Sequence, residues 1–342
     1  MHALMLREHV SLKAMNTFGV EATARWYAEA QSPAELSALL ADKRVSDAEV
    51  LVLGGGSNLL LTRDFDGLVL RCTDAHVRVI APGRDSHLLE VGAGMNWHAF
   101  VDWSLTHGYV GLENLALIPG TVGAAPIQNI GAYGVEVESF INAVEVFDRE
   151  RNCTTIFKRD FCDFAYRWSR FKRMDERGRH IVVNVRFRLP RKAELKLDYP
   201  GMREELAAMR IEAASARDVF DAVCAIRRRK LPDPAVIGNA GSFFKNPIVS
   251  AEAAQTLLAT HPTAPNFDAG DGRRKLGAAW LIDQCGLKGY RDGDAGVSAQ
   301  HALVLVNHGG ASGADLWRVA QHVRATVDTR FGIELEPEPV VI

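Results

Sequence analysis

Apolar residues recur at helical spacing in several segments of the chain, and each segment begins with a capping residue. Ser32 precedes a proline at the first helical position, and Glu35 is placed to close a capping box. Asn96 heads a second segment, which ends before Gly108. Further helices are predicted from Ser215 and Asp218, from Ser250, and over residues 316–327 ahead of Gly332.

Shorter apolar runs lie between these helices and predict β-strands. We expect strands over residues 50–53, 67–71, 88–92, 143–147, 181–188, 302–306 and 333–336. Strands and helices mixed in this way indicate an α+β fold. Residues 110–142 fit neither period, and a loop this long, apolar and glycine-rich is usually functional.

Composition places the chain among ordinary globular proteins: 342 residues, 47% hydrophobic and 24% charged, with a net charge of −2. A charge this small gives no broad basic field, so we expect no nucleic-acid partner. The opening MHALMLREHV is too short and too charged for a signal peptide, and no apolar run approaches the ~18 residues of a membrane span. Five scattered cysteines show neither metal-site nor disulfide spacing. These features predict a cytoplasmic protein with no metal site and no membrane partner.

The segment VLVLGGGSNLLL, residues 50–61, starts like the G-x-G-x-x-G turn that binds dinucleotides. However, Leu59 occupies the third glycine position, and the residues after it predict a strand where that fold needs a helix. Two interpretations stay open: a tight turn, or a phosphate cradle made of successive backbone N–H groups. Further glycine-rich segments at 91–94, 117–123 and 128–134 favour a large flat ligand with a diphosphate, such as a flavin dinucleotide, over several ordinary turns.

Longer motifs narrow this interpretation. The chain contains NTFG at 16–19, IPGTVGAAPIQNIGAYG at 118–134, KLPDP at 230–234, GNAGSFFKNP at 238–247, WLIDQCGLKG at 280–289, ALVLVN at 302–307 and LEPE at 335–338. In this order, and together with GGGSN, they resemble the UDP-N-acetylenolpyruvoylglucosamine reductase family, also called UDP-N-acetylmuramate dehydrogenases. The resemblance runs from about residue 11 to the end of the chain.

The resemblance implies an FAD-binding domain of the PCMH or vanillyl-alcohol-oxidase type, built of two α+β subdomains, and a C-terminal α+β substrate domain. We expect the subdomains at residues 11–77, joined by a C-terminal strand at 333–342, and at 78–231, with the substrate domain at 232–332. FAD is the implied cofactor, NADPH the reductant and a UDP-sugar the substrate. The implied reaction reduces an enolpyruvyl ether in peptidoglycan precursor synthesis, in the cytoplasm, by a monomer.

Main-chain contacts to FAD are expected from the glycine-rich runs. The predicted cofactor-binding residues are Gly54, Gly55, Gly56, Ser57, Asn58, Gly120, Thr121, Gly123, Gln128, Asn129, Gly131, Ala132, Tyr133 and Gly134.

Reduction of the enolpyruvyl group needs a hydride at one carbon, a proton at the other and stabilisation of the charge that develops on the carboxylate. The resemblance assigns the proton to Ser242 and the stabilisation to Arg167 and Glu338. From the residues alone, Ser242 could equally be a turn serine bonded to its own backbone. A hydrolase elbow G-x-S-x-G is a poorer reading of the same segment, because Phe244 replaces its last glycine.

Arg167 and Glu338 also have plain alternatives. Arg167 could be a solvated base, and Glu338 could belong to an exposed row with Glu334 and Glu336 on one face of a strand. The resemblance assigns substrate contacts to Tyr199, Lys230 and Asn246. Helical spacing places Arg227 beside Lys230, so Arg227 either joins a clamp for the UDP diphosphate or complements the C-terminal end of its helix. The chain departs from the family pattern at Trp168, Pro200 and His301, and in the short segment after Glu338. A flavin oxidase of the same superfamily and a non-catalytic nucleotide-sugar binder are the competing functions.

Overall fold

The computed structural model describes residues 5–176 and 178–342, and the chain divides into two compact units. Unit 1 comprises Met1–Val10, Ala24–Gly55 and Phe65–Arg228. Unit 2 comprises Ser11–Thr23, Gly56–Asp64 and Arg229–Ile342. Both units mix helices and strands, as the α+β prediction requires. The three domain boundaries given above remain a prediction.

The first sheet of unit 1 has the strand order β1-β2-β5-β3. Its strands are β1 (Arg7–Ser11), β2 (Thr23–Ala30), β5 (Phe65–Cys72) and β3 (Val50–Val52), and β2, β5 and β3 run parallel. Helix α1 (Pro33–Leu40) packs its Leu36 and Leu39 into the same core. Ser32 caps α1 as predicted, but the Glu35 carboxylate accepts its hydrogen bond from the N–H of Gln31, one residue before the cap, so the capping box does not form.

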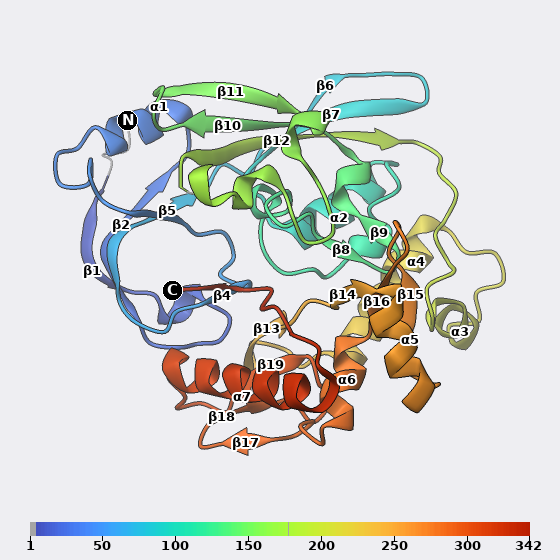
Figure 1. Ribbon diagram of the computed structural model, residues 1–342. Coiled ribbons are helices and arrows are strands. Elements are labelled where there is room, and N and C mark those ends of the chain that lie inside the picture. Colours follow the sequence, from blue (N-terminus) through green and yellow to red (C-terminus); the bar gives the residue numbers. More distant parts are fainter. Residues whose placement is uncertain (1–4, 177) are drawn as a thin grey trace. The chain divides into compact units, whose positions relative to one another are not determined.

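The second sheet of unit 1 is antiparallel, with the order β11-β10-β12-β7-β6 (Figure 1). Its strands are β11 (Cys153–Lys158), β10 (Ile141–Asp148), β12 (His180–Pro190), β7 (Ser86–Gly92) and β6 (Val77–Ala81). Helix α2 (Trp97–Thr106) covers one face of this sheet, with Trp97 and Phe100 against Phe187 of β12. Asn96 caps α2 through its side chain, which confirms the predicted start.

Residues 110–142 form no long element, as predicted. They contain three short 3-10 turns, Glu113–Leu115, Val122–Ala124 and Val137–Ser139, and the small hairpin β8 (Gly131–Ala132) and β9 (Val135–Glu136). Helices α3 (Met202–Ala208) and α4 (Ala216–Lys230) follow β12. Ser215 and Asp218 cap each other's backbone at the start of α4, and α4 ends before Pro232, both as expected.

Unit 2 holds a sheet of order β13-β19-β18-β17 and a second of order β14-β16-β15. The strands are β13 (Gly238–Ser242), β19 (Val304–Asn307), β18 (Ala295–Val297), β17 (Arg291–Asp292), β14 (Ile248–Ser250), β16 (Arg273–Leu276) and β15 (Asn266–Asp268). The helices are α5 (Ala251–Thr260), α6 (Ala278–Gln284) and α7 (Gly313–Phe331). The predicted Ser250 cap of α5 and the left-handed Gly332 after α7 are both present.

One predicted strand is wrong. Residues 333–336 form no ladder, although burial does alternate there, with Leu335 buried and Glu336 exposed. Pro337 and Pro339 lack the N–H that a ladder needs. Pro337 forms a single isolated bridge with Phe244, and a strand forms only beyond the prolines, where β20 (Val340–Val341) lies parallel to β4 (Leu59–Leu60).

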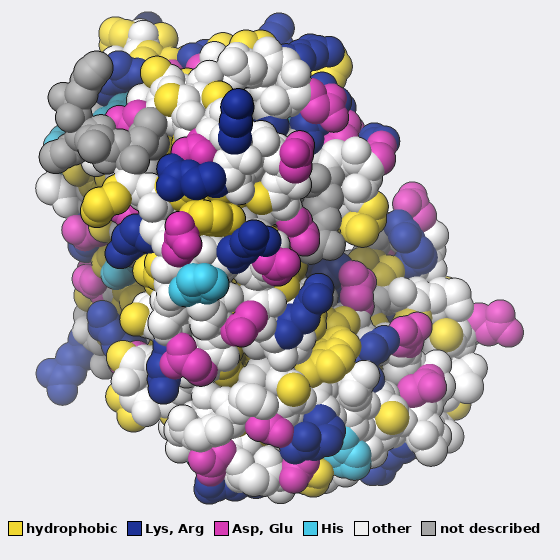
Figure 2. All heavy atoms as spheres, turned by 90° about the vertical axis from the view of Figure 1, so that its left-hand side faces the viewer, with side chains coloured by type: hydrophobic (Ala, Val, Ile, Leu, Met, Phe, Trp, Pro, Cys, Tyr) yellow, Lys and Arg dark blue, Asp and Glu magenta, His cyan; other side chains and the backbone are white. Residues whose placement is uncertain are grey.

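Several elements were not predicted: β1, β2, β6, β11, β13, β16, α3 and α6, besides most strands of two or three residues and four 3-10 turns (Lys13–Met15, Arg159–Cys162, Arg170–Lys172 and Met174–Glu176). No helix in the described part of the chain is long and apolar enough to cross a membrane. On the face shown in Figure 2, acidic and basic side chains are intermingled and neither sign forms a continuous patch.

Candidate active-site residues

Two of the predicted glycine-rich runs lie against each other in unit 1. Gly54 and Gly55 follow β3 directly. A Cβ on Gly55 would stand 2.8 Å from the Cα of Gly120, and a Cβ on Gly54 would stand 2.9 Å from Oγ1 of Thr121. Gly55 therefore lies against the backbone of Gly120, where only glycine leaves enough room, and Gly54 lies against the side chain of Thr121.

The same loop offers a row of hydrogen-bond donors. Within the described residues, the backbone N–H groups of Gly54, Gly55, Gly56 and Ser57 donate no hydrogen bond. Gly56 is buried and has a φ of 62°. Unpaired N–H groups in succession are the usual means of holding a phosphate without a helix, and a buried N–H rarely lacks a partner. This arrangement fits the diphosphate of FAD better than it fits a plain turn.

Asn129 is fully buried, and its amide is satisfied inside the protein. Its Nδ2 donates to Oε2 of Glu136 at 2.9 Å and to the carbonyl of Ala165 at 3.2 Å, while its Oδ1 accepts from the N–H of Glu138. The side chain of Asn129 therefore positions the turn that carries Arg167, and the predicted main-chain contact of Asn129 with FAD stays a prediction.

Arg167 lies at the tip of that turn, with a φ of 53°. Its Nη2 donates to the carbonyl of Gly131 at 2.7 Å. Trp168, which departs from the family pattern, is partly exposed and pairs through its backbone with Ala165. The Gly131 carbonyl thus gives Arg167 a partner that does not depend on the side chain at position 168.

Arg167 belongs to a group that we call the arginine–tyrosine cluster: Arg167, Arg227, Tyr133 and Tyr199, all in unit 1. Tyr133 and Gly134 form the two-residue turn of the β8–β9 hairpin, both with positive φ. The Tyr133 ring meets the edge of Tyr199 at 5.0 Å between centroids. The Tyr133 hydroxyl is a hydrogen-bonding neighbour of Arg227.

Burial lowers the pKa of Arg227, and the nearby charge of Arg167 lowers it further. The Nε of Arg227 is buried without a hydrogen-bond partner among the described residues. Two neighbouring guanidinium groups repel each other, and a buried donor without a partner is unfavourable. An anion between them would relieve both, so the cluster is suited to a carboxylate or a phosphate.

In unit 2, the structure brings the segments of Ser242 and Glu338 together. The Glu338 N–H donates to the carbonyl of Phe243 at 2.8 Å, and the Lys245 N–H donates to the carbonyl of Glu336 at 2.9 Å. Phe244 and Pro337 form the bridge between them. Asn58 contributes as well, because its Nδ2 donates to the carbonyl of Glu338 at 3.3 Å.

Ser242 ends β13 beside an irregularity in the pairing of β13 with β19. Gly241 before it has a φ of 69°. The Ser242 hydroxyl makes no hydrogen bond to any described residue, so the alternative of a turn serine bonded to its own backbone is not what the structure has. Strand irregularities of this kind often re-aim a side chain at an active site.

A second basic group lies in unit 2 around His301. Lys230 and Lys288 are near enough to lower its pKa, although burial is the larger cause. The His301 Nδ1 accepts from the N–H of Leu303, so Nε2 carries the proton of the neutral ring. Asn246, predicted to bind substrate, accepts the N–H of Ala278 at the start of α6 through its Oδ1.

Lys288 is the residue of this group that the sequence analysis did not assign, although it lies within the motif WLIDQCGLKG. The other predicted residues are divided between the units. Gly120, Thr121, Gly123, Gln128, Gly131, Ala132 and Gly134 belong to unit 1, and Gly56, Ser57, Asn58, Lys230 and Asn246 belong to unit 2.

Comparisons with protein families match both halves of the chain. Residues 233–342 match the family described as UDP-N-acetylenolpyruvoylglucosamine reductase, C-terminal domain, and residues 24–153 match an FAD binding domain.

Curated relatives match over nearly the whole chain. The UDP-N-acetylenolpyruvoylglucosamine reductase of Pseudomonas aeruginosa is 51% identical, over 98% of this chain and 99% of its own. That of Chromobacterium violaceum is also 51% identical, over 99% of each chain. Among solved structures, UDP-N-acetylenolpyruvylglucosamine reductase from Thermus caldophilus aligns with a TM-score of 0.69 at 27% identity, covering 98% of this chain and 99% of that one.

Proposed function

Because the chain belongs to the UDP-N-acetylenolpyruvoylglucosamine reductase family, we propose that it reduces UDP-N-acetylenolpyruvoylglucosamine to UDP-N-acetylmuramate with NADPH. The observation that carries this proposal is the similarity to reductases of this name, which extends through both units. The reaction belongs to peptidoglycan precursor synthesis. We place it in the cytoplasm, as a monomer, in support of cell-wall growth and division.

The N–H groups of Gly54, Gly55, Gly56 and Ser57 would hold the FAD diphosphate, with the Gly120–Thr121 backbone beside the loop. Reduced FAD, when bound, supplies the hydride to the enolpyruvyl group.

The protein's own side chains are proposed to manage the charge and the proton. Arg167 pairs with the substrate carboxylate through its planar fork and stabilises the negative charge that develops there. Glu338 assists at the same group. Ser242 donates the proton to the α carbon, and its hydroxyl has no competing hydrogen bond among the described residues.

Binding of the UDP part is assigned to Tyr199, Arg227, Lys230 and Asn246. Arg227 and Lys230 supply positive charge for the diphosphate, and the exposed ring of Tyr199 supplies a surface that can cover the ligand. His301, held neutral, contributes an N–H donor beside Lys230 and avoids a third positive charge there.

The experiment that tests this function separates its two half-reactions. Purified protein loaded with FAD is mixed with NADPH without oxygen, and loss of flavin absorbance is followed. UDP-N-acetylenolpyruvoylglucosamine is then added, and we expect the absorbance to return. A flavin that NADPH does not bleach, or that the substrate does not reoxidise, would overturn the proposal in favour of an oxidase. A protein that takes up no FAD would indicate a nucleotide-sugar binder.

A further inference from the structure

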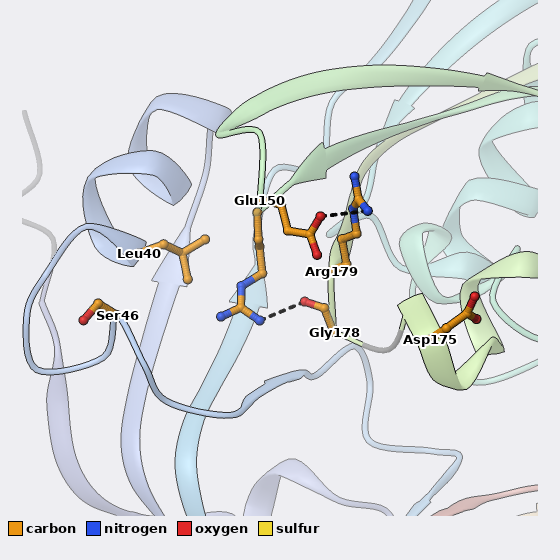
Figure 3. Close-up of a pocket in the computed structure, with 7 residues that line it drawn as sticks. Leu40, Ser46, Glu150, Asp175, Gly178 and Arg179 are labelled. Atoms are coloured by element: carbon orange, nitrogen blue, oxygen red, sulfur yellow. Dashed lines mark hydrogen bonds and ion pairs between the residues drawn. The ribbon is translucent and has the colours of Figure 1, made fainter.

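Unit 1 contains a pocket of about 330 Å³ that the proposed function does not use (Figure 3). Leu40 at the end of α1 forms one wall, and Arg149 and Glu150, in the turn between β10 and β11, form another. Gly178 and Arg179, just before β12, complete it. In Figure 3 the Leu40 side chain points into the space between these elements.

The acidic side chains that line the pocket are already paired. Glu150 forms an ion pair with Arg179 at 2.8 Å, and Arg179 also binds the buried Asp148 through two nitrogens. Asp175 forms an ion pair with Arg173 at 2.9 Å. Arg179 of the lining and Arg173 outside it therefore supply the countercharges of these carboxylates, and neither carboxylate pairs with Arg149.

Arg149 is the exception within the described part of the lining. Its Nη1 donates to the carbonyl of Gly178 at 2.9 Å, and no described carboxylate forms an ion pair with it. Burial alone lowers the pKa of Arg149, with no acidic neighbour opposing the shift. A half-buried guanidinium with one neutral partner keeps donors for an anion, and its charge is poorly compensated without one.

The pocket is separate from the glycine loop. A Cβ on Gly178 would lie 3.6 Å from the carbonyl oxygen of Val50, at the start of β3. Gly54 comes four residues after Val50, beyond the other end of β3. An extended chain spans about 13 Å over four residues. An anion beside Arg149 would therefore not be the FAD diphosphate.

We propose that this pocket binds a small organic anion, whose phosphate or carboxylate group pairs with Arg149 and whose apolar part packs on Leu40. The planar guanidinium can bind either group through two parallel hydrogen bonds. The pocket volume and the single aliphatic wall favour a compact metabolite over a peptide or a nucleic acid.

Calorimetry on the full-length, FAD-loaded protein tests the proposal. Phenyl phosphate, benzoate and inorganic phosphate serve as probes, with UDP in excess to occupy the substrate diphosphate site. We expect saturable 1:1 binding of phenyl phosphate or benzoate, tighter than that of inorganic phosphate because the ring can cover Leu40. If phenyl phosphate binds more tightly than benzoate, the pocket prefers a phosphate group; if benzoate binds more tightly, it prefers a carboxylate.

Arg149→Met should weaken this binding at least tenfold, and Arg149→Lys should weaken it less, because the charge remains. Arg84→Met is the matched control, since Arg84 is an exposed arginine in the loop between β6 and β7 of the same unit. If Arg149→Met fails to fold, Arg149→Lys and Leu40→Ala test the proposal in its place. We expect each of these two variants to bind the aromatic probe less tightly than the unmodified protein. Absence of saturable binding to the unmodified protein, or equal affinity in Arg149→Lys, Leu40→Ala and Arg84→Met, would overturn the proposal.

Discussion

The backbone N–H of Glu338 bonds to the carbonyl oxygen of Phe243, the residue that follows Ser242. The backbone segments that carry the proposed proton donor and the proposed acid are therefore paired with each other. Replacing either side chain should leave this pairing intact, so variants at the two positions report on chemistry more than on folding.

Ser242→Ala should leave flavin reduction by NADPH nearly unchanged and slow reoxidation by the enolpyruvyl substrate by about 10². The reason is that only the second half-reaction needs a proton at carbon. Stopped-flow absorbance of the flavin measures both steps.

Ser250→Ala provides the control for that variant. It removes a hydroxyl from the same unit, but this hydroxyl caps α5. We expect a loss of about 1 kcal/mol in the free energy of unfolding and normal reoxidation. Equal reoxidation rates in the two variants would remove Ser242 from the mechanism.

Arg167→Lys keeps the positive charge but loses the planar fork that grips a carboxylate. Reoxidation by substrate should slow at least about tenfold, with flavin reduction by NADPH unaffected. Arg173→Lys, at an exposed arginine paired with Asp175, should change neither step. An Arg167→Lys protein with unaltered reoxidation would contradict the assigned role.

Gly55→Ala should reduce FAD content and lower stability by about 1–3 kcal/mol, because the new methyl group would meet the Gly120 backbone at 2.8 Å. The ratio of flavin to protein absorbance and thermal unfolding measure the two effects. Gly310→Ala is the matched control, since its methyl group would meet only the movable end of the Asp294 side chain. Full flavin content in Gly55→Ala would argue against a cradle at this loop.

Stability should fall as the pH drops from about 6.5, the ordinary pKa of histidine. Burial lowers the pKa of His98, His180 and His301, so below pH 6.5 the unfolded chain binds more protons than the folded one. Burial raises the pKa of Glu113, so this one carboxyl acts against the histidines above about pH 4.5. The pKa of Asp148, about 2 beside Arg179, makes its stabilising effect fade only when the pH falls below about 4.

His301→Gln should therefore show a shallower loss of stability between pH 8 and pH 5.5, measured as the free energy of unfolding in urea. His308→Gln, at an exposed position, is the control variant. If the two variants match the unmodified protein at both pH values, His301 makes no contribution to the acid sensitivity.

Local chemistry made much of the fold predictable. The caps at Ser32, Asn96 and Ser250 act between neighbours in sequence, so the residues alone identify the helix starts. Strand β2 was missed because Arg25 and Glu29 interrupt its apolar pattern, while its partner β5 begins some forty positions later. Its stability comes from pairing that no local pattern records.

The functional site shows the same contrast between what neighbouring residues predict and what depends on distant ones. The motifs predict Ser242, Glu338 and Arg167 as site residues, but they do not predict which residues surround them. Asn129 lies within the longest motif, but the motif does not show that its side-chain amide bonds to Glu136, Glu138 and Ala165. Arg149 carries no sequence signal at all, because its lack of a countercharge depends on how Arg179 is paired.

The parallel pairing of β4 with β20 has a consequence for folding during synthesis. Thr62, beside β4, donates from its N–H and from its hydroxyl to the carbonyl of Ile342, 280 positions later. At about 5–20 residues per second, a ribosome takes about 14 to 56 s to make that interval. During this time the two leucines of β4 lack β20, the strand that pairs with them. The unpaired edge of β4 is therefore a place where a chaperone can bind the nascent chain.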